Sequence, residues 1–407
     1  MEKPFESLTG FSKRTPLQAA AEAYNLELVR LLVTYRADVN APPEDFRHEL
    51  HSGLTELQAA VQNIPLDNDL ELIRFLLEKG ANPNTPVFCS SRRTALYIAV
   101  DGHKLYNSLG LILLLLKEGA EVNAPPGHCY GSSVMEVAAE TGDLDSMRLL
   151  LRHGGDPNAP AACEGGQTPL QAAVQQHNIE MTQLLLSAGA EVNAPGACRN
   201  GKTALQAALT LSDLDRNLEL LSTLLAAGAD INAPGSIGGR TALQVAAEGG
   251  NSKSVQLLLQ RGANVNAAAC RNGGRTALQA AAGARLGNIE IVKMLLDAGA
   301  DVNGRAARSR GCTALQGAAI RGHMGIAMML LDYGADVNAA AAFSNGKTAL
   351  EGAAEHRRLD MVQLSLNAGA DSNEPEKDRY LSAIELTEVN GHSAVASILK
   401  SYRNSDT

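Results

Sequence analysis

The sequence has no tryptophan and few other aromatic residues, only 6 Phe and 8 Tyr in 407 residues. A core without large rings must be filled by Ala, Leu and Val, which suits thin, closely spaced helices. Cysteine is scarce too: six cysteines in so long a chain do not make a disulfide scaffold, and none has the CxxC or Cys–His spacing of a zinc site. We therefore predict a protein from a reducing compartment, without a metal or a cofactor.

Long apolar runs are also missing. The longest aliphatic run, residues 111–116, is far short of the roughly 20 residues that span a bilayer. The first ten residues carry two Glu and a Pro, which does not fit a signal peptide. The formal net charge of −9 argues against broad binding to nucleic acid or to an anionic membrane. We expect a protein of the cytoplasm or the nucleus that binds neither.

What the sequence has is a repeat. A phrase of Thr, Ala or Pro, Leu and usually Gln, followed by alanines, recurs at intervals of 34 to 40 residues. Its copies begin at Thr15, Thr55, Thr94, Ser133, Thr168, Thr203, Thr241, Thr276, Thr313, Thr348 and, in degraded form, Ser382.

A second phrase, Gly-Ala-Asp-Val-Asn or a near variant, closes ten of these units, as at residues 299–303. Between the two phrases, the apolar spacing of segments such as 288–296 predicts a helix with one buried stripe. The opening Thr suits a helix N-cap, and the closing Gly suits a left-handed residue that ends a helix. Each unit is therefore predicted to be a helix pair, and the chain to be all-α.

These phrases resemble the ankyrin repeat, whose signature opens with Thr-Pro-Leu-His, and the resemblance covers about residues 15–402. It implies a solenoid of about eleven stacked helix-pair units with extended finger loops. We interpret residues 1–407 as a single domain, with an N-terminal partial finger or cap at 1–14, ten repeats at 15–381 and a capping repeat at 382–407. The Ala-Leu-Gln form of the opening phrase is similar to the sequence of the ankyrin arrays of fungi.

Two departures from the family pattern stand out. Gln, Glu or Tyr replaces the signature His, and four of these residues cannot bridge backbone groups as Gln does: Tyr97, Glu136, Glu351 and Glu385. In the units opened by Thr55, Thr94 and Thr203, the span from the opening Thr to the closing Asn is four residues longer than in the first unit. The extra residues would add either a helical turn or a bulged loop.

One motif looks like nucleotide chemistry. Residues 196–203 satisfy the phosphate-loop pattern letter for letter, but such a loop works only between a buried strand and a helix. Because Thr203 is simply the opening Thr of its repeat, we interpret this match as a result of sequence variation among the repeats.

Basic residues recur in the fingers and just before the opening Thr, where stacking would align them along one edge. This edge is either a solvated surface or a docking strip for a protein partner with an acidic surface. The candidate residues on the finger edge are Arg14, Arg93, Arg199, Lys202, Arg240, Arg271, Arg275 and Lys347.

A second candidate set follows the alanine run of each first helix, on the face that the resemblance makes concave. Its residues differ while the framework around them repeats, which fits a recognition surface and also any unconstrained solvent face. The candidates are Asp101, Glu140, Gln175, Gln176, Glu248, Arg321 and His356.

The resemblance and these surfaces lead to a functional hypothesis: a monomeric, non-catalytic scaffold that binds a protein partner through the concave groove and the finger loops. The alternative is an unconventional small-molecule binder or enzyme in the groove of repeats two to six, with Asp101, Glu140 and His177 as acid–base groups. A third option is an array that once accompanied a signalling NTPase.

Overall fold

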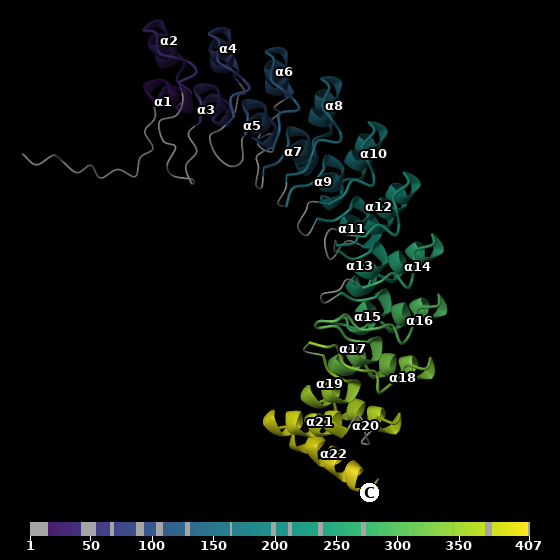
Figure 1. The fold of residues 1–407 in the computed structure, drawn as a ribbon. Helices are drawn as coiled ribbons and strands as arrows, with labels where there is room; N and C mark the ends of the chain where they lie inside the picture. The colour runs from purple at the N-terminus through teal and green to yellow at the C-terminus, as the bar shows by residue number, and fades with distance from the viewer. Residues whose placement is uncertain are drawn as a thin grey trace, which may run out of the picture. The chain divides into compact units, whose positions relative to one another are not determined.

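The computed structural model describes residues 15–41, 54–65, 69–86, 93–102, 109–126, 131–162, 165–196, 201–210, 214–234, 239–269, 274–344, 346–370 and 377–405. Every regular element in these ranges is a helix (Figure 1), as the sequence predicts. The contacts divide the chain into two compact units, residues 1–201 and 202–407. The expectation of one continuous domain stays a prediction.

The first unit holds five helix pairs. Its helices are α1 (Pro16–Glu22), α2 (Leu26–Thr34), α3 (Glu56–Gln62), α4 (Glu71–Glu78), α5 (Ala95–Asp101), α6 (Leu109–Lys117), α7 (Val134–Thr141), α8 (Leu144–Arg152), α9 (Pro169–Gln175) and α10 (Ile179–Ser187).

The second unit holds six pairs. Its helices are α11 (Ala204–Ala208), α12 (Leu214–Ala226), α13 (Ala242–Gly249), α14 (Ser252–Gln260), α15 (Ala277–Ala282), α16 (Ile289–Asp297), α17 (Ala314–Arg321), α18 (Met324–Asp332), α19 (Ala349–Glu355), α20 (Leu359–Asn367), α21 (Lys377–Val389) and α22 (Ser393–Ser405).

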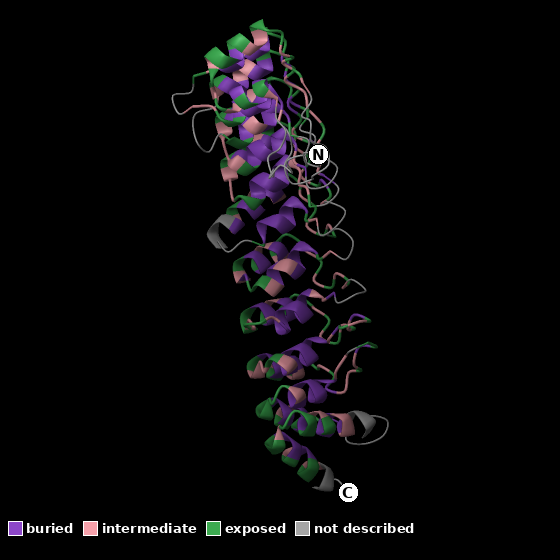
Figure 2. Cartoon of the chain, turned by 90° about the vertical axis from the view of Figure 1, so that its left-hand side faces the viewer, coloured by how far each residue is buried: buried purple, intermediate pink, exposed green. Residues whose placement is uncertain are grey.

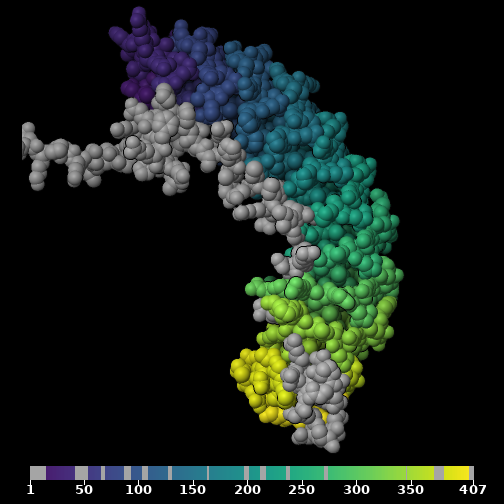
Figure 3. Space-filling view, viewed as in Figure 1, coloured from purple at the N-terminus to yellow at the C-terminus, as the bar shows by residue number. Residues whose placement is uncertain are grey.

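Within each unit the first helices of successive repeats pack side by side in one row, and the second helices form a parallel row (Figure 1). The rows pack closely because the first helices are rich in alanine: Ala280, Ala281 and Ala282 are all at most 1 % exposed. Buried residues concentrate where helices face one another, and exposed residues lie at helix ends and loops (Figure 2). In the space-filling view the colour changes gradually along each unit, so segments that follow one another in sequence lie next to one another (Figure 3).

In eight repeats the opening phrase starts the first helix by a capping box. In α15 the Thr276 hydroxyl accepts from the Gln279 N–H at 3.2 Å, and the Gln279 carbonyl oxygen accepts from the Thr276 N–H at 3.0 Å. Each bond satisfies a backbone donor that a helix start leaves without an intrahelical partner. The same box begins α1, α3, α9, α11, α13, α17 and α19.

The Gln of this phrase has a second role. Its Nε2 donates to carbonyls at the base of the finger that leaves the same repeat, as Gln279 does to Gly304 at 2.8 Å and Arg305 at 3.1 Å. Tyr97 and Glu136 form no capping box. Glu351 forms the capping box, because its carboxylate accepts from the Thr348 N–H at 2.8 Å. Unlike Gln, it has no N–H with which to donate to the finger, as the sequence predicts.

The closing phrase joins one repeat to the next. The Asn303 Nδ2 donates to the carbonyl of Gly334 at 3.0 Å, and the Asn303 Oδ1 accepts from the Asp336 N–H at 2.8 Å. Gly334 itself has φ +84°, a left-handed conformation that glycine adopts without strain. Sequence reasoning assigned this phrase only to a turn and missed the link. The same two bonds are made by Asn40, Asn84, Asn123, Asn158 and Asn266.

The extra residues of the long repeats lie outside the first helices. Helices α3 and α5 have seven residues, like α1, so the added residues of these repeats fall between the two helices. In the repeat opened by Thr203, α11 has only five residues and α12 has 13.

The last repeat begins earlier than expected. Helix α21 starts at Lys377, so Ser382 lies inside a helix and cannot be its cap, and Glu385 lies there too. The reason is a helical apolar spacing that reaches back past Ser382: Tyr380, Ala383 and Ile384 are all buried, and the Tyr380 hydroxyl donates to the Leu399 carbonyl at 2.8 Å.

Candidate interaction surface

The C-terminal ends of the first helices, seven and eight residues after the opening Thr or Ser, form an exposed strip in each unit, which we call the first-helix face. Glu248 is half-buried, and the other candidates there are exposed: Asp101, Glu140, Gln175, Gln176, Arg321 and His356. The structure thus places the predicted concave-face residues at accessible positions on a repeating scaffold.

The basic residues that precede the opening Thr do not form a separate positive stripe. The Arg93 guanidinium lies 3.9 Å from the carboxylate of Asp101, and Arg240 pairs with Glu248. Each acidic residue stands seven positions after the opening Thr of the same repeat. Seven residues of helix rise about 10 Å, a span that two long side chains cover when they reach toward each other. The two predicted strips are therefore one surface in these repeats.

Arg275 shows why the pairing is not always within a repeat. Its own repeat has Gly283 at the seventh position, which offers no side chain, and its guanidinium lies 3.9 Å from the carboxylate of Glu248 in the preceding repeat. Glu248 therefore faces two cations. Carboxylates of the chain itself thus lie beside these basic residues, and their use as a docking strip stays a prediction.

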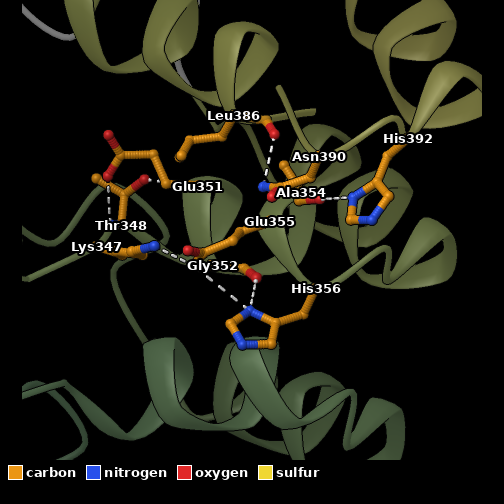
Figure 4. Close-up of polar contacts among 10 residues, drawn as sticks. All are labelled: Lys347, Thr348, Glu351, Gly352, Ala354, Glu355, His356, Leu386, Asn390 and His392. Carbon is orange, nitrogen blue, oxygen red and sulfur yellow. Dashed lines mark hydrogen bonds and ion pairs between the residues drawn. The ribbon is translucent and has the colours of Figure 1, made fainter. Parts of the chain in front are cut away.

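The repeat opened by Thr348 shows the arrangement in full (Figure 4). Lys347 pairs with Glu355, and the Nδ1 of His356 lies 3.6 Å from the same carboxylate and 3.0 Å from the carbonyl of Gly352. The next repeat attaches beside it: the His392 Nδ1 lies 3.2 Å from the carbonyl of Ala354. His356 thus remains exposed on the first-helix face while its ring is held in place.

The sequence contained a signal for these pairs. A basic residue before the opening Thr coincides with an acidic residue seven positions after it in four repeats, as Arg14/Glu22, Arg93/Asp101, Arg240/Glu248 and Lys347/Glu355. In the repeat opened by Thr168 both positions are Gln, and the amide of Gln167 donates to that of Gln175. Reading the repeats in register would have found the match.

Three members of the basic set, Arg14, Arg199 and Arg271, lie outside the described residues. Lys202 is exposed, and its counterpart seven positions after Thr203 is Thr210, which carries no charge. Arg93 has a further contact, with its guanidinium 5.2 Å from the ring centre of Tyr97. Burial raises the pKa of the Tyr97 hydroxyl, which Arg93 partly counteracts.

Two carboxyl groups in the first unit are buried, which the sequence does not predict. Glu136 is 2 % exposed and Glu56 is fully buried, and each has one oxygen without a hydrogen-bond partner. Burial raises the pKa of both carboxyls to about 7. Glu140 adds to the shift of Glu136, and Asp38 adds to that of Glu56. In the sequence, Glu136 is marked only as a replacement for the Gln of the opening phrase, and Glu56 is not marked at all; neither pattern shows that the carboxyl is buried.

The enzyme hypothesis named Asp101, Glu140 and His177. Asp101 lies 3.9 Å from Arg93, and Glu140 is exposed at the end of α7. His177 is a half-buried loop residue with φ +55°, and its Nδ1 has no hydrogen-bond partner in the part of the chain that the structure describes. Among the described residues no group of three His, Cys, Asp or Glu side chains could hold a metal ion, and no helix there could cross a membrane. Thr203, the last residue of the phosphate-loop match, caps α11, and the described residues before it, 165–196, form helices and loops without a strand.

Comparison with known proteins agrees with this architecture. The family model for ankyrin repeats (3 copies) matches residues 3–87, 134–235, 212–306 and 303–376. No curated protein matches the sequence. The repeated helix pairs, their Thr and Asn links and a family match over most of the chain show that it belongs to the ankyrin repeat family.

Proposed function

We propose that this protein is a non-catalytic scaffold that binds a partner protein through the first-helix face and the finger loops. Ankyrin repeats are in general protein–protein interaction modules. We further propose that the scaffold is a monomer and acts in the cytoplasm or the nucleus.

The proposal rests on a difference between two kinds of position in the repeat. The side chains that hold the repeats together, such as Gln279 and Asn303, use their polar groups on the backbone of the chain itself. The positions on the first-helix face vary in charge and size from repeat to repeat while the framework stays constant. Such a face can change its partner without a change of fold, and contacts spread over several repeats support specificity.

The ion pairs limit what the partner can be. Because Arg93, Arg240 and Lys347 are each paired with a carboxylate, these repeats present a mosaic of positive and negative side chains and not a continuous positive surface. A partner that binds there must match the mosaic, and like charges placed opposite each other would exclude others. We therefore expect an acidic surface of the partner to bind at basic residues that no carboxylate of the chain pairs with.

The test begins with capture of partners from native cells on the full-length chain, followed by mass spectrometry. Binding of the captured protein is then measured for Arg321→Glu and for Lys293→Glu, which makes the same charge change on the exposed side of α16 in the second-helix row. We expect Arg321→Glu to weaken binding and Lys293→Glu to leave it unchanged. Equal affinities for both variants and the wild type would contradict the use of the first-helix face in the second unit.

A further inference from the structure

Two neighbouring finger loops of the second unit, residues 304–311 and 339–346, form a surface that the first-helix face does not include. Both belong to the described residues except for residue 345. Each turns sharply at its tip: a Cβ on Gly311 would lie 2.3 Å from the backbone nitrogen of Ala307, and one on Gly346 would lie 2.1 Å from that of Ala342. Only glycine fits at these two positions, so the tip geometry is fixed by the sequence.

The two tips are joined to each other by their backbones. The Arg310 N–H donates to the Ser344 carbonyl at 3.0 Å, and the Ser344 N–H donates to the Arg308 carbonyl at 3.2 Å. These bonds make a parallel bridge between Ser309 and Ser344, and the two loops run side by side between α16 and α17 and between α18 and α19 (Figure 1). Fingers tied in this way lose little conformational freedom when a ligand binds.

An aromatic ring and an arginine meet at the bridged tips. Phe343 is 86 % exposed, in a chain that has only 6 Phe, and the Arg308 guanidinium lies 5.4 Å from the centre of its ring. A planar guanidinium over a ring keeps its edge free to form two hydrogen bonds to a carboxylate.

Among the described residues, no carboxylate balances the charge of the tips. Residues 304–311 contain three arginines and no acid, and Arg305, Arg308 and Arg310 are all exposed. No ion pair joins these three to a carboxylate among the described residues, whereas Arg240 and Arg275 both reach Glu248. Among these five arginines, the unmatched positive charge therefore lies at the finger tips.

We propose that the Arg308–Phe343 tip cluster, with Arg305 and Arg310, binds an acidic segment of the partner protein in which an apolar side chain stands among Asp or Glu residues. The inference rests on the proposed function and assigns a partner chemistry to one part of it. The guanidinium groups bind the carboxylates, and the free face of the Phe343 ring receives the apolar side chain. Single-stranded nucleic acid is less well matched, because one ring offers no row of stacking platforms and the whole chain carries a net charge of −9.

The experiment uses the full chain and a fluorescein-labelled peptide of twelve residues, made of Asp and Glu with one central Leu. Fluorescence anisotropy should show saturable binding that weakens as salt is raised. Arg308→Glu should reduce the affinity roughly tenfold or more, as for a hydrogen-bonded charge pair. Phe343→Ala, which changes no charge, should reduce it as well. Arg285→Glu, in the exposed loop between α15 and α16, makes the same charge change as Arg308→Glu and should have little effect.

The outcomes separate this proposal from the proposed function. Absence of saturable binding, equal losses in Arg285→Glu and Arg308→Glu, or tighter binding of a twelve-nucleotide single-stranded DNA would each overturn the tip site. If the captured partner is lost with Arg321→Glu but is unaffected by Arg308→Glu and Phe343→Ala, the tip site is wrong and the scaffold function stands. Because these tip side chains are exposed, all variants should unfold at the wild-type temperature, which circular dichroism checks.

Discussion

The backbone N–H of Gln167 donates to the Oε1 of Glu136 at 2.9 Å, across the boundary between two repeats. In the next repeat the equivalent side chain, Gln171, does the reverse, and its Nε2 donates to the carbonyl of Ala194 at 3.1 Å. A carboxylate has no N–H to donate, so at Glu136 the link between helix and finger depends on an acceptor. The other oxygen of Glu136 is buried without a partner, which disfavours the ionised form.

Glu136→Gln should therefore stabilise the first unit at neutral and alkaline pH. The pKa of Glu136 is about 7 when folded and 4.5 as a free side chain, so the folded state holds its proton longer than the unfolded state. The contribution of Glu136 to the free energy of unfolding is therefore largest below pH 4.5 and is lost as the pH rises through 7. Removing the titration should add about 1–3 kcal/mol at pH 8 and much less at pH 5.

Thermal unfolding followed by circular dichroism at pH 5 and pH 8 measures this difference. Glu180→Gln, on the exposed side of α10, removes a carboxylate that does not contribute to the shift of Glu136; it is the matched control and should not change the pH dependence. A gain from Glu136→Gln that is the same at both pH values would show that the carboxyl does not titrate as its burial indicates.

Asn303→Ala should destabilise the second unit, because the side chain joins two repeats by bonds to Gly334 and Asp336. Two hydrogen bonds at an exposed position are together worth about 1–2 kcal/mol. Asn303→Asp keeps the acceptor and replaces the donor with a charge that repels the Gly334 carbonyl, so it should cost at least as much. Asn367→Ala, which removes only an exposed bond from Gln363 within α20, is the control for urea unfolding. A cost no larger than that of Asn367→Ala would refute the link.

Much of this architecture could be predicted from the sequence, and the remainder could not for physical reasons. The Thr caps and the left-handed glycines are local, since the interactions of Thr276 and the backbone of Gly334 are decided within a few residues. The partner of Asn303 is a carbonyl in the next repeat, which has no side-chain signature. The extra residues before α4 could not be placed by counting, because one turn of helix and a loop need the same number of residues. The pair Arg240/Glu248 was visible only by comparing repeats in register.

That pair gives a direct test of the first-helix face as one surface. Arg240→Glu should destabilise the second unit slightly, by less than about 1 kcal/mol, because it places a second carboxylate beside Glu248 in a half-exposed setting. The swap Arg240→Glu with Glu248→Arg should restore part of the loss. Urea unfolding of the two single variants and the swap forms a double-mutant cycle. A coupling of zero at low salt would mean that the two side chains do not interact in solution.

Gly352→Ala tests the fit between the first helices of two repeats. Gly352 lies in α19, where alanine would normally be the better helix former by up to about 1 kcal/mol. A Cβ there, however, would lie 2.6 Å from the Cγ1 of Ile320 in α17, and a β-branched side chain has few rotamers with which to retreat. The collision should outweigh the helix propensity, so we expect a net loss of about 1–2 kcal/mol.

Ile320→Ala supplies the matching control, since it removes the atoms that the new methyl group would meet. With alanine at 320, the additional Gly352→Ala change should become neutral or stabilising, because only its gain in helix propensity remains. Urea unfolding of the four proteins measures the reversal of sign. If Gly352→Ala has the same effect with Ile and with Ala at position 320, the spacing of α17 and α19 is not set by this contact. Small residues such as Gly352 would then be explained by their own helix alone.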